Sequence, residues 1–159
     1  REGLMFAVDP IRAVSEIARV LRRGGRFVAA VWGPRERNPW LGVVFDAVSE
    51  QLGKPTPPSG VPHPFSLSDS EQLADVLEAG GLAEIVIESR SVPLRAGSFD
   101  EWWTRTSALA GLLSAVLGSL DDDARRELRD RARERTRAFE TAHGLDFPGR
   151  SLVASSRRP

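Results

Sequence analysis

The chain has 159 residues, in which 22 lysines and arginines balance 22 aspartates and glutamates, and it contains no cysteine. This length favours one domain with a single core, and the balanced charge gives no electrostatic reason to expect nucleic acid or an anionic membrane as a partner. The lack of cysteine excludes disulfides, thiolate nucleophiles and zinc–thiolate sites. No apolar run approaches the roughly 18 residues of a membrane span and no signal segment is present, so we expect a cytoplasmic protein.

The first predicted elements are a helix over residues 10–23 and a strand over residues 27–32. Asp9 and Pro10 form an N-cap and first-turn pair, and Gly24-Gly25 supplies a left-handed stop. Between them, apolar residues recur at helical spacing: Val14, Ile17, Ala18 and Leu21. The strand, FVAAVW, is apolar on both faces, which is typical of a strand covered on two sides.

A second helix is predicted from Asn38-Pro39 to Leu52, followed by a stiff proline-rich loop over residues 53–66. Ser68 and Glu71 have the spacing of a capping box before a helix that stops at Gly80-Gly81. The next strand is expected over residues 84–92.

The remaining chain is predicted to be mainly helical. Ser98 and Glu101 form a second capping box, ahead of a long helical region that contains Trp102 and Trp103, and one of these adjacent rings is expected in the core. A charged helix then begins at residues 121–123 and ends near His143 and Gly144, where the His143 ring would favour the helix dipole. Residues 151–155 form the last of three expected strands.

Several stretches resemble, in order, the second half of class I S-adenosylmethionine-dependent methyltransferases, closest to the quinone-biosynthesis-like branch. Residues 1–9 fit a loop of the form RxGLMFxxD, and EIARVLRRGGRFVAAVWG fits the helix and fifth strand of that family. NPW at 38–40 resembles the start of a helix that caps the substrate pocket. LADVLEAGGLAEIVIE resembles the helix and sixth strand, and FPGRSLVASSRR the final strand.

The resemblance implies an α/β fold: the C-terminal part of a doubly wound, Rossmann-like sheet of about three strands, the last antiparallel, with inserted helices. It divides residues 1–159 into five segments of one partial domain. These are a loop–helix–strand–helix unit at 1–52, the loop 53–66, a helix and strand at 67–95, a helical substrate cap at 96–144, and the final strand and tail at 145–159.

The cofactor implied is S-adenosylmethionine, but the motifs that would bind it are not in this sequence. Gly24-Gly25 closes a helix before a strand, whereas a nucleotide-binding loop must follow a strand and open a helix. With a start at Arg1 rather than methionine, we expect the chain to be the C-terminal half of an enzyme and inactive alone. Its FVAAVW strand would then lie at an open sheet edge, which predicts a homodimer or completion of the sheet by a missing N-terminal half.

The resemblance also implies site residues. Arg1 and Gly3 would lie next to the cofactor, and the acceptor pocket would be formed by Leu4, Met5, Phe6, Trp32, Asn38, Trp40 and His63. Apolar residues of this kind are as often plain core, and Asn38 and Trp40 are typical of a helix cap and anchor. His63 is a candidate general base, although a lone loop histidine is more often exposed to solvent without a role. No residues have the spacing of a metal site, and we expect no metal.

The predicted function is methyl transfer to a small-molecule acceptor by in-line displacement at the methyl sulfonium, with the pocket supplying alignment and no catalytic residue identified. The first alternative is a non-catalytic interaction module or a degenerate partner subunit. A second is another doubly wound enzyme such as a reductase, which the absence of a dinucleotide fingerprint disfavours.

Overall fold

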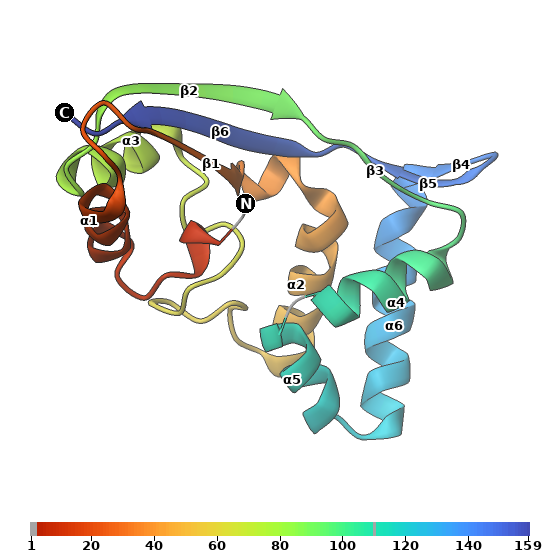
Figure 1. Cartoon of the computed structure of the whole chain (residues 1–159). Coiled ribbons are helices and arrows are strands. Elements are labelled where there is room, and N and C mark those ends of the chain that lie inside the picture. Colours follow the sequence, from red (N-terminus) through yellow and green to blue (C-terminus); the bar gives the residue numbers. More distant parts are fainter. Residues whose placement is uncertain (1–2, 110) are drawn as a thin grey trace. The chain divides into compact units, whose positions relative to one another are not determined.

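The computed structural model describes residues 3–109 and 111–159, which form two compact units (Figure 1). Unit 1 comprises residues 3–37, Val61–Val92 and Arg150–Pro159. Unit 2 comprises Asn38–Gly60 and Pro93–Gly149. Because the chain passes between the units several times, each unit brings together segments that are distant in sequence.

Unit 1 is built on a three-stranded sheet in the order β1-β6-β2. β6 (Arg150–Arg157) is antiparallel to both β1 (Arg26–Trp32) and β2 (Ala83–Ser91), with Ala29 opposite Ala154 and Ile87 opposite the same residue. The two outer strands are therefore parallel to each other, and the prediction of an antiparallel last strand is confirmed.

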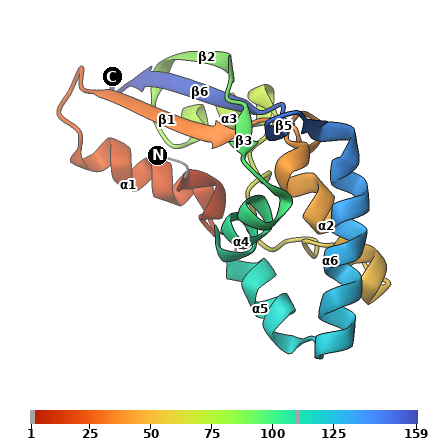
Figure 2. The ribbon, with the colours of Figure 1, turned by 90° about the vertical axis from the view of Figure 1, so that its right-hand side faces the viewer.

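Two helices, α1 (Pro10–Val20) and α3 (Ser70–Ala79), lie on the same side of this sheet (Figures 1 and 2). Their apolar stripes pack with the sheet into one core cluster, which includes Val14, Leu73, Leu77, Val31 and Leu152. The Asp9 carboxylate accepts the Arg12 N–H at 2.9 Å, as the predicted cap requires.

The cap of α3 differs from the prediction. Asp69, not Ser68, is the N-cap residue, and its carboxylate accepts the Gln72 N–H at 2.9 Å. A carboxylate caps a first turn as a hydroxyl does, so the cap and its N–H donor both lie one residue later than predicted and the helix begins at Ser70.

The described residues of unit 2 form four helices and a second small sheet. The helices are α2 (Pro39–Leu52), α4 (Phe99–Leu109), α5 (Gly111–Ser119) and α6 (Asp122–Thr136). The sheet has the order β3-β5-β4, with β3 at Leu94–Ala96, β5 at Gly144–Phe147 and β4 at Glu140–Thr141. Leu128 and Ala132 of α6 are fully buried, whereas most of the charged side chains of this helix are exposed.

Trp102 anchors the core of unit 2. Its side chain is fully buried and its indole N–H donates to the Trp40 carbonyl at 3.0 Å, whereas Trp103 is only half-buried. The expectation that one of the two adjacent rings is core is thus confirmed.

The charged helix is shorter than predicted. The three expected strands form the unit 1 sheet, and the described residues of unit 2 form three further short strands that the sequence did not predict. α6 ends at Thr136, and three-residue 3₁₀ turns occur at Arg137–Phe139, Leu4–Phe6 and Arg35–Arg37. His143 therefore lies in a β-hairpin, not in a helix, and its N–H donates to Thr141 Oγ1 at 3.1 Å. The close approach of Gly144 requires glycine, since a Cβ there would lie 2.2 Å from the Ala96 carbonyl oxygen.

Candidate functional site

The predicted pocket residues divide between the two units. Unit 1 contains Leu4, Met5, Phe6, Trp32 and His63, together with Gly3 at the N-cap of the first 3₁₀ turn. Unit 2 contains Asn38 and Trp40, and Arg1 lies outside the described residues.

The 3₁₀ turn Leu4–Phe6 presents its three side chains to different surroundings. Met5 is 2% exposed and belongs to the unit 1 core cluster. Leu4 is half-buried against that cluster, while Phe6 is 50% exposed. Of these three side chains, only Leu4 and Phe6 are exposed enough to contact a ligand.

Trp32 ends β1 and is half-buried against the same core cluster. The strand is closed at this point by the Gly33 N–H, which donates to the Arg150 carbonyl at 2.9 Å. Ligands of open α/β sheets bind beyond the carboxyl ends of the strands, which is the position of Trp32.

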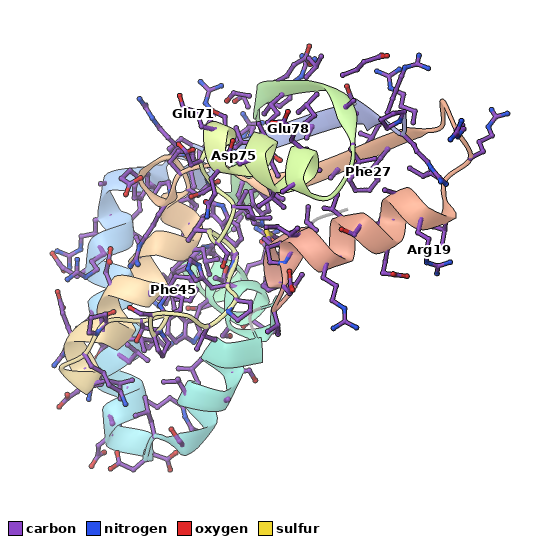
Figure 3. All side chains as sticks on the ribbon, turned by 90° about the vertical axis from the view of Figure 1, so that its left-hand side faces the viewer. Arg19, Phe27, Phe45, Glu71, Asp75 and Glu78 are labelled. Carbon is purple, nitrogen blue, oxygen red and sulfur yellow. The ribbon has the colours of Figure 1, made fainter. Side chains whose placement is uncertain are left out.

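An apolar groove of about 300 Å³ runs beside β1. Its lining residues come from β1, from α1 and from the chain around the first 3₁₀ turn, and none of them is polar. They include Ile17 and Phe27, and Figure 3 shows Phe27 between β1 and α1. The exposed large apolar side chains of the described residues all belong to unit 1, among them Phe6, Val8, Ile11 and Val28.

The two edges of the unit 1 sheet differ in how they are protected. Along β2 the pairing with β6 shifts register between Ala83 and Val86, and Glu84 has a φ of 51°, in the left-handed region. Such a bulge, together with the charged residues Glu88 and Arg90, blunts an edge against further pairing. β1 has an unbroken register over all seven residues and, within residues 3–109 and 111–159, pairs with no strand except β6. β1 is therefore the edge on which the sheet can continue.

Asn38 and Trp40 are packing residues of unit 2. Asn38 is fully buried, and its side chain makes no cap bond to α2; its Oδ1 instead accepts the Trp40 indole N–H at 3.4 Å. The prediction of Asn38 as the N-cap residue of α2 is confirmed by its position, although its side chain makes no hydrogen bond to the first turn.

His63 belongs to a tight turn at residues 63–66. Its N–H donates to Ser66 Oγ at 2.9 Å, and the Ser66 N–H donates back to the His63 carbonyl at 3.0 Å. The ring itself accepts the Phe65 N–H at Nδ1, over 3.1 Å. Burial of the half-buried ring, and secondly the positive charge of Arg35, lower the pKa of His63 below its ordinary value of 6.5.

Two further hollows could not be located from the sequence. In unit 2, about 510 Å³ opens between β3, the start of α4 and the β4–β5 hairpin, beside Glu101, His143 and Asp146. Its charges are engaged, since Asp146 pairs with Arg95 at 3.1 Å and Glu101 accepts the Gly97 N–H at 2.8 Å. The hollow depends on the β4–β5 hairpin, and the sequence predicted a helix at that place.

In unit 1, a groove of about 510 Å³ lies between α3 and β2, with Glu71 and Glu78 on one wall and Ile85 and Ile87 on the other. Figure 3 shows Glu71, Asp75 and Glu78 along α3. Their spacing follows from the amphipathic pattern of the helix, so this acidic stripe is its solvated face.

Among the described residues, no three histidines or carboxylates are grouped so that they could hold a metal ion. None of the described helices is long and apolar enough to span a membrane.

Comparisons with known proteins show the fold. No protein-family model and no protein of curated function matches the chain. Solved structures do, among them BH2331 of Bacillus halodurans C-125, provisionally assigned as a methyltransferase, and the YcgJ protein of Bacillus subtilis. Each is 18% identical to this chain and superposes with a TM-score of 0.51 over 100% of it. The chain spans 67% and 62% of those proteins, so it shares a mixed α/β fold with part of each.

Proposed function

We propose that this chain is the C-terminal part of a class I S-adenosylmethionine-dependent methyltransferase domain and takes part in methyl transfer to a small-molecule acceptor. The observation that carries the proposal is the β1-β6-β2 sheet, blunted at β2 and open at β1. The order of motifs along the sequence and the likeness to BH2331 support it independently.

The described residues do not themselves fit the cofactor. A site for its nucleoside needs a glycine-rich turn that follows a strand and opens a helix. Here Gly33 follows β1 but its N–H is engaged by Arg150, and β2 leads through Val92 and Pro93 into β3. We therefore assign cofactor binding to a further segment whose sheet would continue from β1, and derive no step through the cofactor from these residues.

The contribution proposed for unit 1 is one wall of the acceptor pocket. Methyl transfer demands alignment of donor and acceptor in a site that excludes water, and apolar walls suit that demand. Leu4, Phe6 and Trp32 are the candidates, since Leu4 and Trp32 are half-buried against the unit 1 core and Phe6 is 50% exposed. Met5, by its burial, would support them from behind.

The test is an assay of methyl transfer and cofactor binding with methyl-labelled S-adenosylmethionine. We expect the 159-residue chain alone to bind no cofactor and transfer no methyl group. Produced together with the in-frame coding sequence that precedes Arg1 in its gene, it should do both. Turnover by the chain alone, or an upstream sequence without a cofactor-binding half, would contradict the proposal.

A non-catalytic interaction module is the second candidate, and the apolar groove beside β1 is the observation that favours it. Such a module would bind another sheet-containing protein at β1 without any methyl transfer in the combined assembly. Cofactor binding by the longer chain therefore separates the two functions.

A further inference from the structure

His63 is held in one orientation by the turn that it forms. Three hydrogen bonds between residues 63 and 66 close this turn, and one of them ends on the ring nitrogen Nδ1. The ring also lies edge-on to the buried Phe65 ring, with 6.4 Å between centroids. The direction of the remaining nitrogen, Nε2, is thereby fixed.

The bond at Nδ1 decides which nitrogen carries the proton. An imidazole nitrogen that accepts a hydrogen bond must use its lone pair, so in the neutral ring the proton is on Nε2. The lowered pKa keeps the ring neutral at physiological pH. Nε2 can then only donate a hydrogen bond, and a general base with a free lone pair is excluded at this position.

Nε2 is also accessible. Among the described residues it has no hydrogen-bond partner, and it is not one of the buried polar atoms that lack one. Arg35, whose charge acts on the ring, belongs to the 3₁₀ turn that follows the carboxyl end of β1. His63 thus presents a fixed N–H donor whose ring is acted on by the positive charge of Arg35.

We propose that His63 determines specificity by donating its Nε2–H to an anionic oxygen, such as a carboxylate, of the methyl acceptor. This inference rests on the proposed function but names its substrate class. A fixed donor beside a positive charge favours an oxyanion over a neutral hydroxyl, because charge-assisted hydrogen bonds are the stronger ones. His63 would bind and orient the acceptor and would take no proton from it.

The first measurement is the tautomer of His63, by long-range ¹H–¹⁵N NMR on the labelled chain. The chain has only two histidines, so the variant His143→Gln leaves His63 as the single signal. We expect the Nε2–H tautomer at pH 7.5. The Nδ1–H tautomer, or a ring in free exchange between the two, would overturn the inference whether or not the chain belongs to a methyltransferase.

The second measurement is a titration of the same sample with benzoate, with benzyl alcohol as the uncharged control. Benzoate should shift the His63 signals and benzyl alcohol should not. His63→Asn keeps an acceptor for the Phe65 N–H and removes the distal donor, so it should weaken benzoate binding at least about tenfold without changing Tm. His63→Gln, which keeps an N–H near the Nε2 position, should bind more tightly than His63→Asn.

If His63→Asn lowers Tm, its weaker binding could reflect lost stability. The oxyanion assignment is then tested by the comparison of benzoate with benzyl alcohol in the His143→Gln chain. Equal shifts from both compounds, or no shift from benzoate, would overturn the oxyanion assignment. Failure of the labelled-cofactor assay, by contrast, would remove the methyl-transfer role and leave an oxyanion site at His63.

Discussion

Glu84 is the described non-glycine residue whose backbone lies in the left-handed region, and it sits in the bulge of an edge strand. This conformation is unfavourable for a residue with a Cβ and costs glycine nothing. Its pair with Arg157, at 3.1 Å, joins two largely exposed side chains and contributes little stability. The bulge therefore costs some free energy of folding at Glu84, as is typical of bulges that end the pairing of a sheet.

Glu84→Gly should accordingly be more stable than Glu84→Ala by about 1 kcal/mol. Both variants lose the pair with Arg157, so the difference isolates the backbone effect. Thermal unfolding of the two proteins measures it. Equal stability would mean that residue 84 does not hold a left-handed conformation.

His63 should make stability depend on pH. Because its pKa in the folded chain is lowered below 6.5, the unfolded chain binds the proton first as pH falls. The stability contributed by the neutral ring is thus complete above about pH 6.5, the ordinary value for histidine, and is lost as pH falls through the lowered pKa.

In the variant His63→Asn the decrease in Tm between pH 7.5 and pH 5.5 should be smaller than in the parent chain. His143→Gln, in the exposed hairpin, serves as the matched control. An unchanged decrease in His63→Asn would show that the ring is not buried as described.

At the scale of the elements, helix α3 packs against α1 through a glycine contact. A Cβ added at Gly80 would lie 2.3 Å from Val14 Cγ1, and Val14 is fully buried. Gly80→Ala should therefore destabilise the chain by roughly 1–3 kcal/mol through overpacking. The double variant with Val14→Ala should lose less than the sum of the two single variants.

Gly118, inside α5, is the matched control for Gly80, since a Cβ there meets nothing within 4 Å. Gly118→Ala should leave stability unchanged or raise it by up to about 1 kcal/mol. Denaturant unfolding of the four variants, namely the two single variants, their double variant and Gly118→Ala, gives the comparison. Additive losses in the Val14/Gly80 pair would contradict the packing of α1 on α3.

The elements set by local signals were predictable, and those set by distant contacts were not. α1 and α2 begin where Asp9-Pro10 and Asn38-Pro39 place a cap and a proline, because these residues act within one turn. β4 and β5 have two and four residues, too few for an alternating pattern, and depend on the close approach of Gly144 to Ala96. The charged helix α6 precedes these strands, and no glycine or proline marks its end at Thr136.

The candidate site was predicted less well for the same reason. The apolar residues at the start of the chain and at the end of β1 could be chosen by type, but their type does not separate buried Met5 from exposed Phe6. The bonds of His63 to Phe65 and Ser66 depend on backbone turns, which residue spacing alone does not specify.

At the scale of the whole molecule, an open apolar edge predicts association. The isolated chain should self-associate through β1, and a charge on that strand should reduce this. Val28→Lys places lysine at a 57% exposed position of β1, whereas Val86→Lys does the same at a 55% exposed position of blunted β2. Sedimentation should show a lower average mass for the first variant only. A monomeric parent chain at all concentrations would contradict the prediction.

The central claim is that the unit 1 sheet continues beyond β1 and ends at β2. Hydrogen exchange of backbone amides tests it most directly, since pairing protects amides that an open edge exposes to water. The 159-residue chain, with Val28→Lys to limit self-association, is compared with the same variant joined to its upstream coding sequence. The account predicts that the longer chain protects further amides of β1 and leaves those of β2 unchanged. New protection at β2, or none at β1, would contradict it.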